Sequence, residues 1–246
     1  MMTDFKHFVS LGHFCSVAMD LEALGLREAS LPFDWNIDLD LPKLLDCIRN
    51  GFDGFLEEDE LEQSREDPSH YMNRYGVQFF HDFDPYRPLA EQLPAVQEKY
   101  RRRISRFYET VKEPTLFLRY ITDAVKDAQG EPTEVRYLQT HYDEVLALLR
   151  SFNPANDLLL IANEGCAALP SLYTVRPDAG DIVARTPRRA NPALGALLSG
   201  FSVPNQTENR RKGAKAARRR KLTKLRKALA RKLPHKAYNR HEKTYD

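Results

Sequence analysis

The chain has 246 residues, of which 42% are hydrophobic and 29% are charged, so it can bury a substantial core as one large domain or two small ones. No apolar run is long enough to span a bilayer, and the N-terminus lacks the basic and then apolar pattern of a signal peptide, so we expect a cytoplasmic protein. The three cysteines, Cys15, Cys47 and Cys166, are too few and too scattered for a disulfide framework. No C-x-x-C pair offers a zinc site, and we expect neither a metal nor a cofactor.

Charge is distributed unevenly along the chain. Residues 209–246 carry 16 Lys or Arg against two acids, about +14. Of the 37 bases and 35 acids in total, the remainder keeps 21 bases and 33 acids, about −12. The sequence therefore predicts an acidic body and a strongly basic C-terminal tail.

The N-terminal segment predicts a strand, a glycine turn and a helix. Residues 7–11 have the apolar composition of a short buried strand, Gly12 interrupts it, and residues 16–24 have apolar side chains at helical spacing. Gly25 is the predicted C-terminal cap of that helix. Cys15 therefore falls at or just before the first helical turn, where unpaired N–H groups and the helix dipole favour a thiolate and could hold an oxyanion.

Strands and helices alternate through the following segments. We predict helices over residues 42–50, 93–111 and 133–152 and strands over residues 71–83, 115–121 and 157–162. Residues 57–68 should form a solvated loop or an exposed helix, and residues 123–133 a loop. The pattern weakens after Cys166, where residues 181–185 could form a last strand and residues 186–192 a loop. The alternation predicts a single layered α/β domain over residues 1–203 with an at least partly parallel sheet, followed by a basic helical tail over residues 204–246.

Ligands of such sheets gather where the strands end. This rule would bring residues 12–15, residues 121–123 and Asn163 together at one edge of the sheet. The glycine turn and helix N-terminus could also bind a phosphate-bearing donor at Gly12 and Cys15.

Residues 10–15, SLGHFC, and residues 30–35, SLPFDW, together form a pattern of uncommon residues at fixed offsets. This pattern resembles the bacterial family of putative papain-like cysteine peptidases, from about Phe8 to about Glu164. The resemblance implies a cysteine nucleophile at Cys15 and a histidine partner further along the chain. Gly12, Asp34, Trp35 and Asn163 are the candidate substrate-binding residues. Papain itself has a helical domain packed on an antiparallel barrel, whereas the elements predicted here favour an α/β sheet.

His81 is the candidate general base. A histidine titrates near neutral pH, so it can take the thiol proton and later give it to a leaving group, and Asp82 or Asn163 could orient its ring. The resembling family also has a histidine–aspartate pair in this region. The structural alternative is a partly buried histidine beside a turn. His13 could touch the thiol locally, but a short turn would usually point it outward.

The tail from Arg210 to Leu233 has helical composition, with leucines along one side and Lys or Arg nearly everywhere else. Such a helix suits the anionic inner face of a membrane, where each basic residue contributes about 1 kcal/mol. Nucleic acid is a less favoured partner because no aromatic residues interleave for base stacking. A merely solvated tail is the third reading.

Three functions stay open from sequence. The first is a cysteine-dependent hydrolase of peptide or other acyl substrates, with Cys15 as nucleophile and His81 as base. The second is a transferase in cell-surface polysaccharide biosynthesis that binds a phosphate-bearing donor at the glycine turn. The third is a non-catalytic binding protein held at the membrane by its tail.

Overall fold

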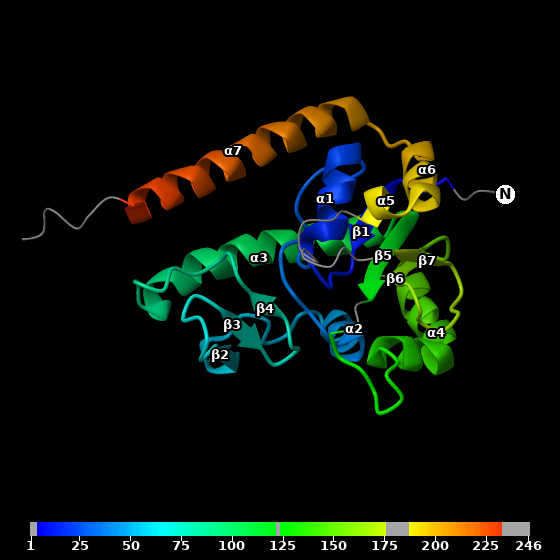
Figure 1. The fold of residues 1–246 in the computed structure, drawn as a ribbon, viewed down its shortest axis with the longest axis horizontal. Coiled ribbons are helices and arrows are strands. Elements are labelled where there is room, and N and C mark those ends of the chain that lie inside the picture. The colour runs from blue at the N-terminus through cyan, green and yellow to red at the C-terminus, as the bar shows by residue number, and fades with distance from the viewer. Residues whose placement is uncertain (1–3, 122–123, 176–186, 233–246) are drawn as a thin grey trace, which may run out of the picture.

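A computed structural model describes residues 4–121, 124–175 and 187–232, with side chains of the last helix described as far as residue 223. Its centre is a sheet of four strands in the order β1-β5-β6-β7 (Figure 1). The strands are β1 His7–Ser10, β5 Thr115–Ile121, β6 Asp157–Asn163 and β7 Leu172–Val175. All three pairings are parallel. The predicted α/β fold with a parallel sheet is therefore confirmed.

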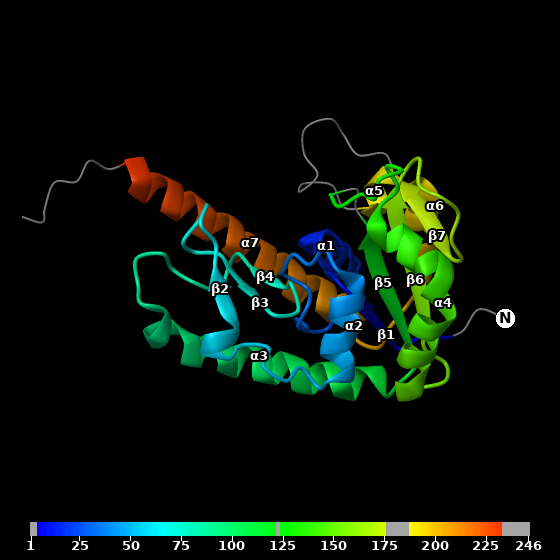
Figure 2. The same cartoon turned by 90° about the horizontal axis from the view of Figure 1, so that it is seen from below.

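Successive residues of the central strands point to opposite faces of the sheet, and both faces are buried. In β5, Phe117 and Ile121 enter one core, whereas Leu116 and Leu118 enter the other. The first core is closed by helices α2 (Leu41–Arg49), α3 (Leu89–Val111) and α4 (Thr133–Phe152), and the second by α1 (Cys15–Leu24) and α6 (Pro192–Gly200). The sheet thus lies between two helical layers (Figure 2).

The predicted end of α1 is confirmed in detail. Gly25 has φ +70°, and its N–H donates to the carbonyl of Glu22 at 3.1 Å. The N–H of Leu26 then donates to the carbonyl of Leu21 at 2.9 Å. This left-handed cap satisfies the last carbonyls of the helix and fixes its length.

The segment between α2 and α3 forms a separate antiparallel sheet, in the order β2-β3-β4. Its strands are β2 Leu61–Gln63, β3 Tyr71–Asn73 and β4 Gln78–Phe79, and a single 3₁₀ turn, Glu58–Glu60, precedes them. Two expectations were wrong here: residues 57–68, predicted as a solvated loop or an exposed helix, contain β2 after the 3₁₀ turn, and the predicted strand over residues 71–83 is a hairpin. Gly76, with φ +72°, turns the hairpin, and Asn73 Oδ1 accepts N–H groups from within it.

The segment after β6 also differs from the expectation. A fourth parallel strand, β7, follows Cys166, and helix α5 (Pro187–Ala190) occupies the predicted loop over residues 186–192. Asn191 separates α5 from α6 because its side chain accepts the N–H of Leu194 at 3.0 Å and so caps α6. The strand considered over residues 181–185 lies outside the described residues.

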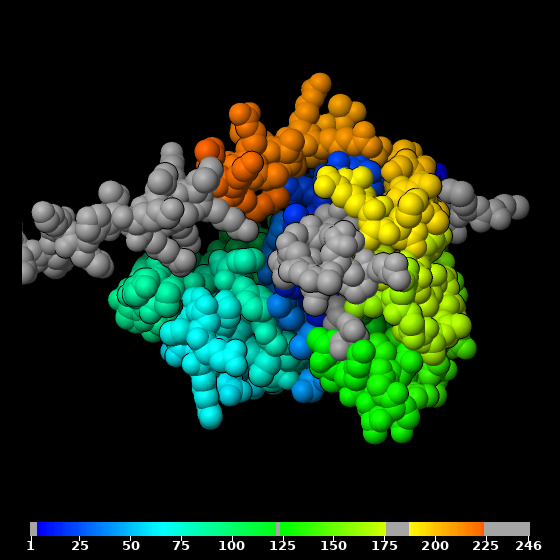
Figure 3. Space-filling model, in the orientation of Figure 1, coloured from blue at the N-terminus to red at the C-terminus, as the bar shows by residue number. Residues whose placement is uncertain are grey.

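The C-terminal helix α7 (Gln206–Lys232) packs by its first half against α1 (Figure 1), and in the space-filling view it lies over the outer side of α1 (Figure 3). Gln206 Nε2 and Arg210 Nε both donate to the carbonyl of Leu24, at 2.9 and 2.8 Å. Further along, Arg220 donates to Glu22 Oε1 at 2.6 Å. These contacts between α7 and α1 are polar. Leu222, one of the leucines expected along one side of α7, is 55% exposed. Among the helices that the structure describes, none is long and apolar enough to cross a membrane.

Candidate active site

The turn between β1 and α1 carries the predicted nucleophile. The N–H of Leu11 donates to the carbonyl of Leu118 at 2.9 Å and extends the sheet, and Gly12 then turns the chain with φ +81°. Phe14 is extended and is the N-cap of α1, and its own side chain makes no capping hydrogen bond. Cys15 is therefore the first residue of α1, partly exposed, at the carboxyl edge of the sheet.

Below this turn lies a buried charge network that sequence analysis did not identify. Arg119 of β5 is fully buried and donates to the carbonyl of Leu11 at 2.6 Å. Its guanidinium forms ion pairs with Asp38 and with Glu134, the second residue of α4. The other oxygen of the Glu134 carboxylate accepts Arg119 Nε at 3.0 Å. One cation thus joins β1, the segment before α2, and α4, and it holds the turn in place.

Gly12 is required by this network. A Cβ atom at this position would lie 1.9 Å from Asp38 Oδ2 and 3.3 Å from Arg119 Nη1. Asp38 Oδ2 is buried and has no hydrogen-bond partner, because it faces the glycine. Burial raises the pKa of the Asp38 carboxyl to about 6, although Arg119 opposes the shift. The N–H of Gly12, an expected oxyanion donor, is directed to Ser10 Oγ at 3.3 Å.

His13 lies inside the protein, so the expectation that a short turn would point it outward was wrong. The N–H of Asp38 donates to the carbonyl of His13 at 3.1 Å, and the ring of His13 meets the ring of Tyr120 edge-on. His13 Nδ1 lies 3.1 Å from the carbonyl oxygen of Asp38. Since a carbonyl can only accept, Nδ1 carries the proton and Nε2 is left as an acceptor. Burial and then Arg119 lower the pKa of His13 to about 4, so the ring is neutral at physiological pH.

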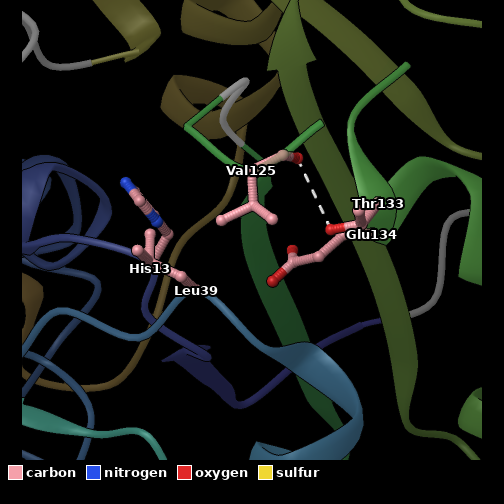
Figure 4. Close-up of a pocket in the computed structure, with 5 residues that line it drawn as sticks. All are labelled: His13, Leu39, Val125, Thr133 and Glu134. Atoms are coloured by element: carbon pink, nitrogen blue, oxygen red, sulfur yellow. Dashed lines mark hydrogen bonds between the residues drawn. The ribbon is translucent and has the colours of Figure 1, made fainter. Parts of the chain in front are cut away.

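A small pocket adjoins the turn (Figure 4). It is lined by His13, Leu39, Val125, Thr133 and Glu134. Thr133 Oγ1 donates to the carbonyl of Val125 at 3.4 Å across one side. The pocket therefore lies between the turn and the start of α4, and it borders the Arg119 network through Glu134.

Asn163 lies at the end of β6, on the same sheet edge as the turn. Its Oδ1 accepts the hydroxyl of Tyr120 at 2.9 Å. Tyr120 in turn contacts His13. Of the strand ends expected to meet, His13 and Asn163 are thus joined through Tyr120, whereas residues 122 and 123 lie outside the described residues. His81 is not part of this path.

His81 and Asp82 follow β4, in the small antiparallel sheet rather than the central one. His81 is exposed. The Asp82 carboxylate forms an ion pair with Lys99 and accepts the hydroxyl of Tyr100 at 3.0 Å, and both partners belong to α3. The carboxylate of Asp82 thus contacts two side chains of α3. Its expected role of orienting the His81 ring stays a prediction.

Asp34 and Trp35 lie on the segment between α1 and α2. Asp34 is fully buried, forms an ion pair with Arg27 and accepts the N–H of Leu31 at 2.9 Å. Trp35 Nε1 donates to Ser30 Oγ at 3.0 Å. These contacts fix the course of the segment, and the substrate-binding role of both residues stays a prediction.

The surroundings of the other two cysteines disfavour a thiolate. Cys47 is fully buried on α2, and burial raises the pKa of its thiol strongly. Cys166 is partly exposed, and burial raises the pKa of its thiol as well. Over residues 4–121, 124–175 and 187–232, no group of three or more His, Cys, Asp or Glu side chains could hold a metal ion.

The fold and turn define an α/β protein with a cysteine at a strand-to-helix turn. The model of a family described as "Putative papain-like cysteine peptidase" matches residues 6–144. An uncharacterized protein of Acanthamoeba polyphaga mimivirus is 36% identical over 182 residues, covering 66% of this chain and 80% of that protein. The chain therefore belongs to this family. No solved structure matches it.

The family match covers the turn, His81 and the Arg119 network, and it ends within α4, before Asn163. The relative is viral, so the bacterial origin of the family stays a prediction.

Proposed function

We propose that the protein is a cysteine-dependent acyl hydrolase that acts on peptide or other acyl substrates, with Cys15 as nucleophile. The observation that carries the proposal is the position of Cys15 as the first residue of α1. The N–H groups of the first turn and the positive end of the helix dipole favour the thiolate over the thiol. Membership of the peptidase family supports the same reaction class.

His13 is the candidate proton acceptor nearest to Cys15 in the chain, although burial and Arg119 lower its pKa to about 4 and so make it a weak base. Phe14 is extended, with φ −146° and ψ 167°, and the residues on either side of an extended residue project to the same side of the chain. His13 and Cys15 flank Phe14, so their side chains project to the same side of the chain. The bond from Nδ1 to Asp38 fixes the tautomer, which leaves Nε2 able to accept the thiol proton. His81 stays the second candidate, because it lies in the matched part of the family and next to a carboxylate.

The proposed reaction has two steps. The thiol proton passes to a histidine as the sulfur attacks the acyl carbon, and the first N–H groups of α1 stabilise the oxyanion that forms. The histidine returns the proton to the leaving group, which departs and leaves a thioester on Cys15. Water then attacks the thioester, with the histidine again taking a proton, and the acid product leaves.

Turnover of 4-nitrophenyl acetate, with intact-protein mass spectrometry, tests the proposal. We expect an acetyl adduct on Cys15 and turnover in the wild type and in Cys166→Ala, and neither in Cys15→Ala. Unchanged far-ultraviolet circular dichroism would show that Cys15→Ala is folded. Turnover in Cys15→Ala at the wild-type rate would contradict the proposal.

The same assay identifies the base. Loss of a general base lowers the rate by about 10²–10⁴-fold. We expect this loss in His13→Gln and a much smaller change in His81→Gln. The reverse result would assign the base to His81 and leave the role of Cys15 intact.

A further inference from the structure

A second polar cluster, separate from the turn, surrounds Ser30 and Trp35. Ser30 Oγ accepts Trp35 Nε1 at 3.0 Å and Arg27 Nη1 at 3.3 Å, and the carbonyl of Ser30 accepts Arg106 Nη2 at 2.9 Å. The guanidinium groups of Arg27 and Arg220 lie 5.0 and 4.8 Å from the centroid of the Trp35 ring. The cluster therefore draws arginines from α3, α7 and the segment after α1 to one place.

The carboxylates of the cluster are already shared among some of these arginines. Glu22 pairs with both Arg27 and Arg220, and Asp34 pairs with Arg27. On α3, Arg103 and Arg106 lie one turn apart on the same side of the helix. Neither of them has a carboxylate within ion-pair distance in the part of the chain that the structure describes.

Arg103 and Arg106 show the signs of an unmet charge. Arg103 is half-buried against the ring of Tyr100, and its Nη1 is buried with no hydrogen-bond acceptor. A buried donor without an acceptor is costly, so this nitrogen favours an acceptor that the described residues do not supply. Burial, and then the neighbouring charges of Arg103 and Arg102, lower the pKa of Arg106, and the more distant Asp34 carboxylate opposes the shift.

We propose that Arg103 and Arg106 bind a phosphate group beside Ser30. Two guanidinium forks on one helix face offer several N–H donors in planes that match the oxygens of phosphate. The two arginines without a carboxylate supply a charge of +2, and a phosphate or phosphomonoester carries about −1.5 to −2 at pH 7. Trp35, Arg27 and Arg220 form the neighbouring wall. The proposal does not rest on the reaction at Cys15.

Isothermal titration of the full-length protein with inorganic phosphate, at constant ionic strength, tests the site. Arg101→Gln is the matched control, because Arg101 lies on the same helix, is exposed and is paired with Glu98. We expect one saturable site in the wild type. Loss of one charged hydrogen-bonding group should weaken phosphate binding by about tenfold or more in Arg103→Gln and in Arg106→Gln. Arg101→Gln should bind phosphate as tightly as the wild type.

A second arm uses glycerol phosphate as a soluble phosphomonoester. Tighter binding of the ester would indicate a phosphorylated metabolite or headgroup, and tighter binding of inorganic phosphate would indicate the free ion; both support the site. Three results would overturn it: no saturable binding, an equal loss in Arg101→Gln, or equally tight binding of acetate. Cys15→Ala should bind phosphate like the wild type, so this test is independent of catalysis.

Discussion

Gly12→Ala tests the arrangement of the turn. The new methyl carbon would lie 1.9 Å from Asp38 Oδ2 and 2.9 Å from its Cγ, far inside van der Waals contact. The Asp38 carboxylate must move, and movement breaks a fully buried pair with Arg119. Breaking such a pair costs about 3–5 kcal/mol, and a left-handed backbone costs a non-glycine residue about 1–2 kcal/mol. We expect a loss of about 4–7 kcal/mol, which is a large part of the stability of an ordinary domain.

Gly130→Ala is the control for this prediction. Gly130 has φ +84°, close to the +81° of Gly12, but nothing lies within 4 Å of its Cβ position. This variant should therefore lose only the backbone part, about 1–2 kcal/mol. Urea unfolding followed by circular dichroism measures both variants. If Gly12→Ala proved no less stable than Gly130→Ala, the contact between the turn and the Arg119 network would be wrong.

Three further predictions concern pH and α7. The folded pKa of Asp38 is raised from 3.8 to about 6, so its contribution to the free energy of unfolding falls by about 3 kcal/mol as pH rises between these values. The folded pKa of His13 is lowered from 6.5 to about 4, so its contribution rises over nearly the same window. His13→Gln should therefore become less stable than the wild type by a growing margin from pH 4 to 6.5, in urea unfolding at each pH; a constant margin would refute the assignment. Glu22→Gln removes the carboxylate shared by Arg27 and Arg220, so trypsin should cleave α7 faster than in Glu208→Gln, and equal rates would refute the packing of α7 on α1. Vesicles with anionic lipid should bind the wild type. Exchanging exposed Arg211 and Lys215 for Glu should weaken this binding by about 1 kcal/mol or more per residue. Equal binding of the wild type to neutral vesicles would exclude an electrostatic role for α7.

Local patterns in the sequence predicted β1, β5 and β6 of the central sheet and helices α1 to α4, because each of these segments carries its own apolar pattern. Helix α4 has the predicted bounds of residues 133–152, and β5 has those of residues 115–121. The cap at Gly25 was predictable because a single glycine after an amphipathic run has one common role. The strands of the small sheet are only two or three residues long, too short to show a period, and their pairing depends on the hairpin turn at Gly76.

The charge network beneath the turn could not be predicted in the same way. Arg119 is the one charged residue in the otherwise apolar or neutral strand TLFLRYI. That isolated charge was the available signal in the sequence for a buried ion pair. Its partners are 81 residues away at Asp38 and 15 residues away at Glu134, and only the packed fold brings them together. The burial of His13 has the same origin, because the chain around Asp38 returns to cover the turn.

The most direct test of the central claim compares Cys15 with Cys166 in one sample. Iodoacetamide labelling of the folded protein is followed from pH 5 to 10 by peptide mass spectrometry. The helix N-terminus should give Cys15 an inflection below the ordinary thiol pKa of about 8.5. Burial should place the inflection of Cys166 above that value. A Cys15 thiol that titrates at or above the ordinary value, and labels no faster than Cys166, would contradict its assignment as the nucleophile.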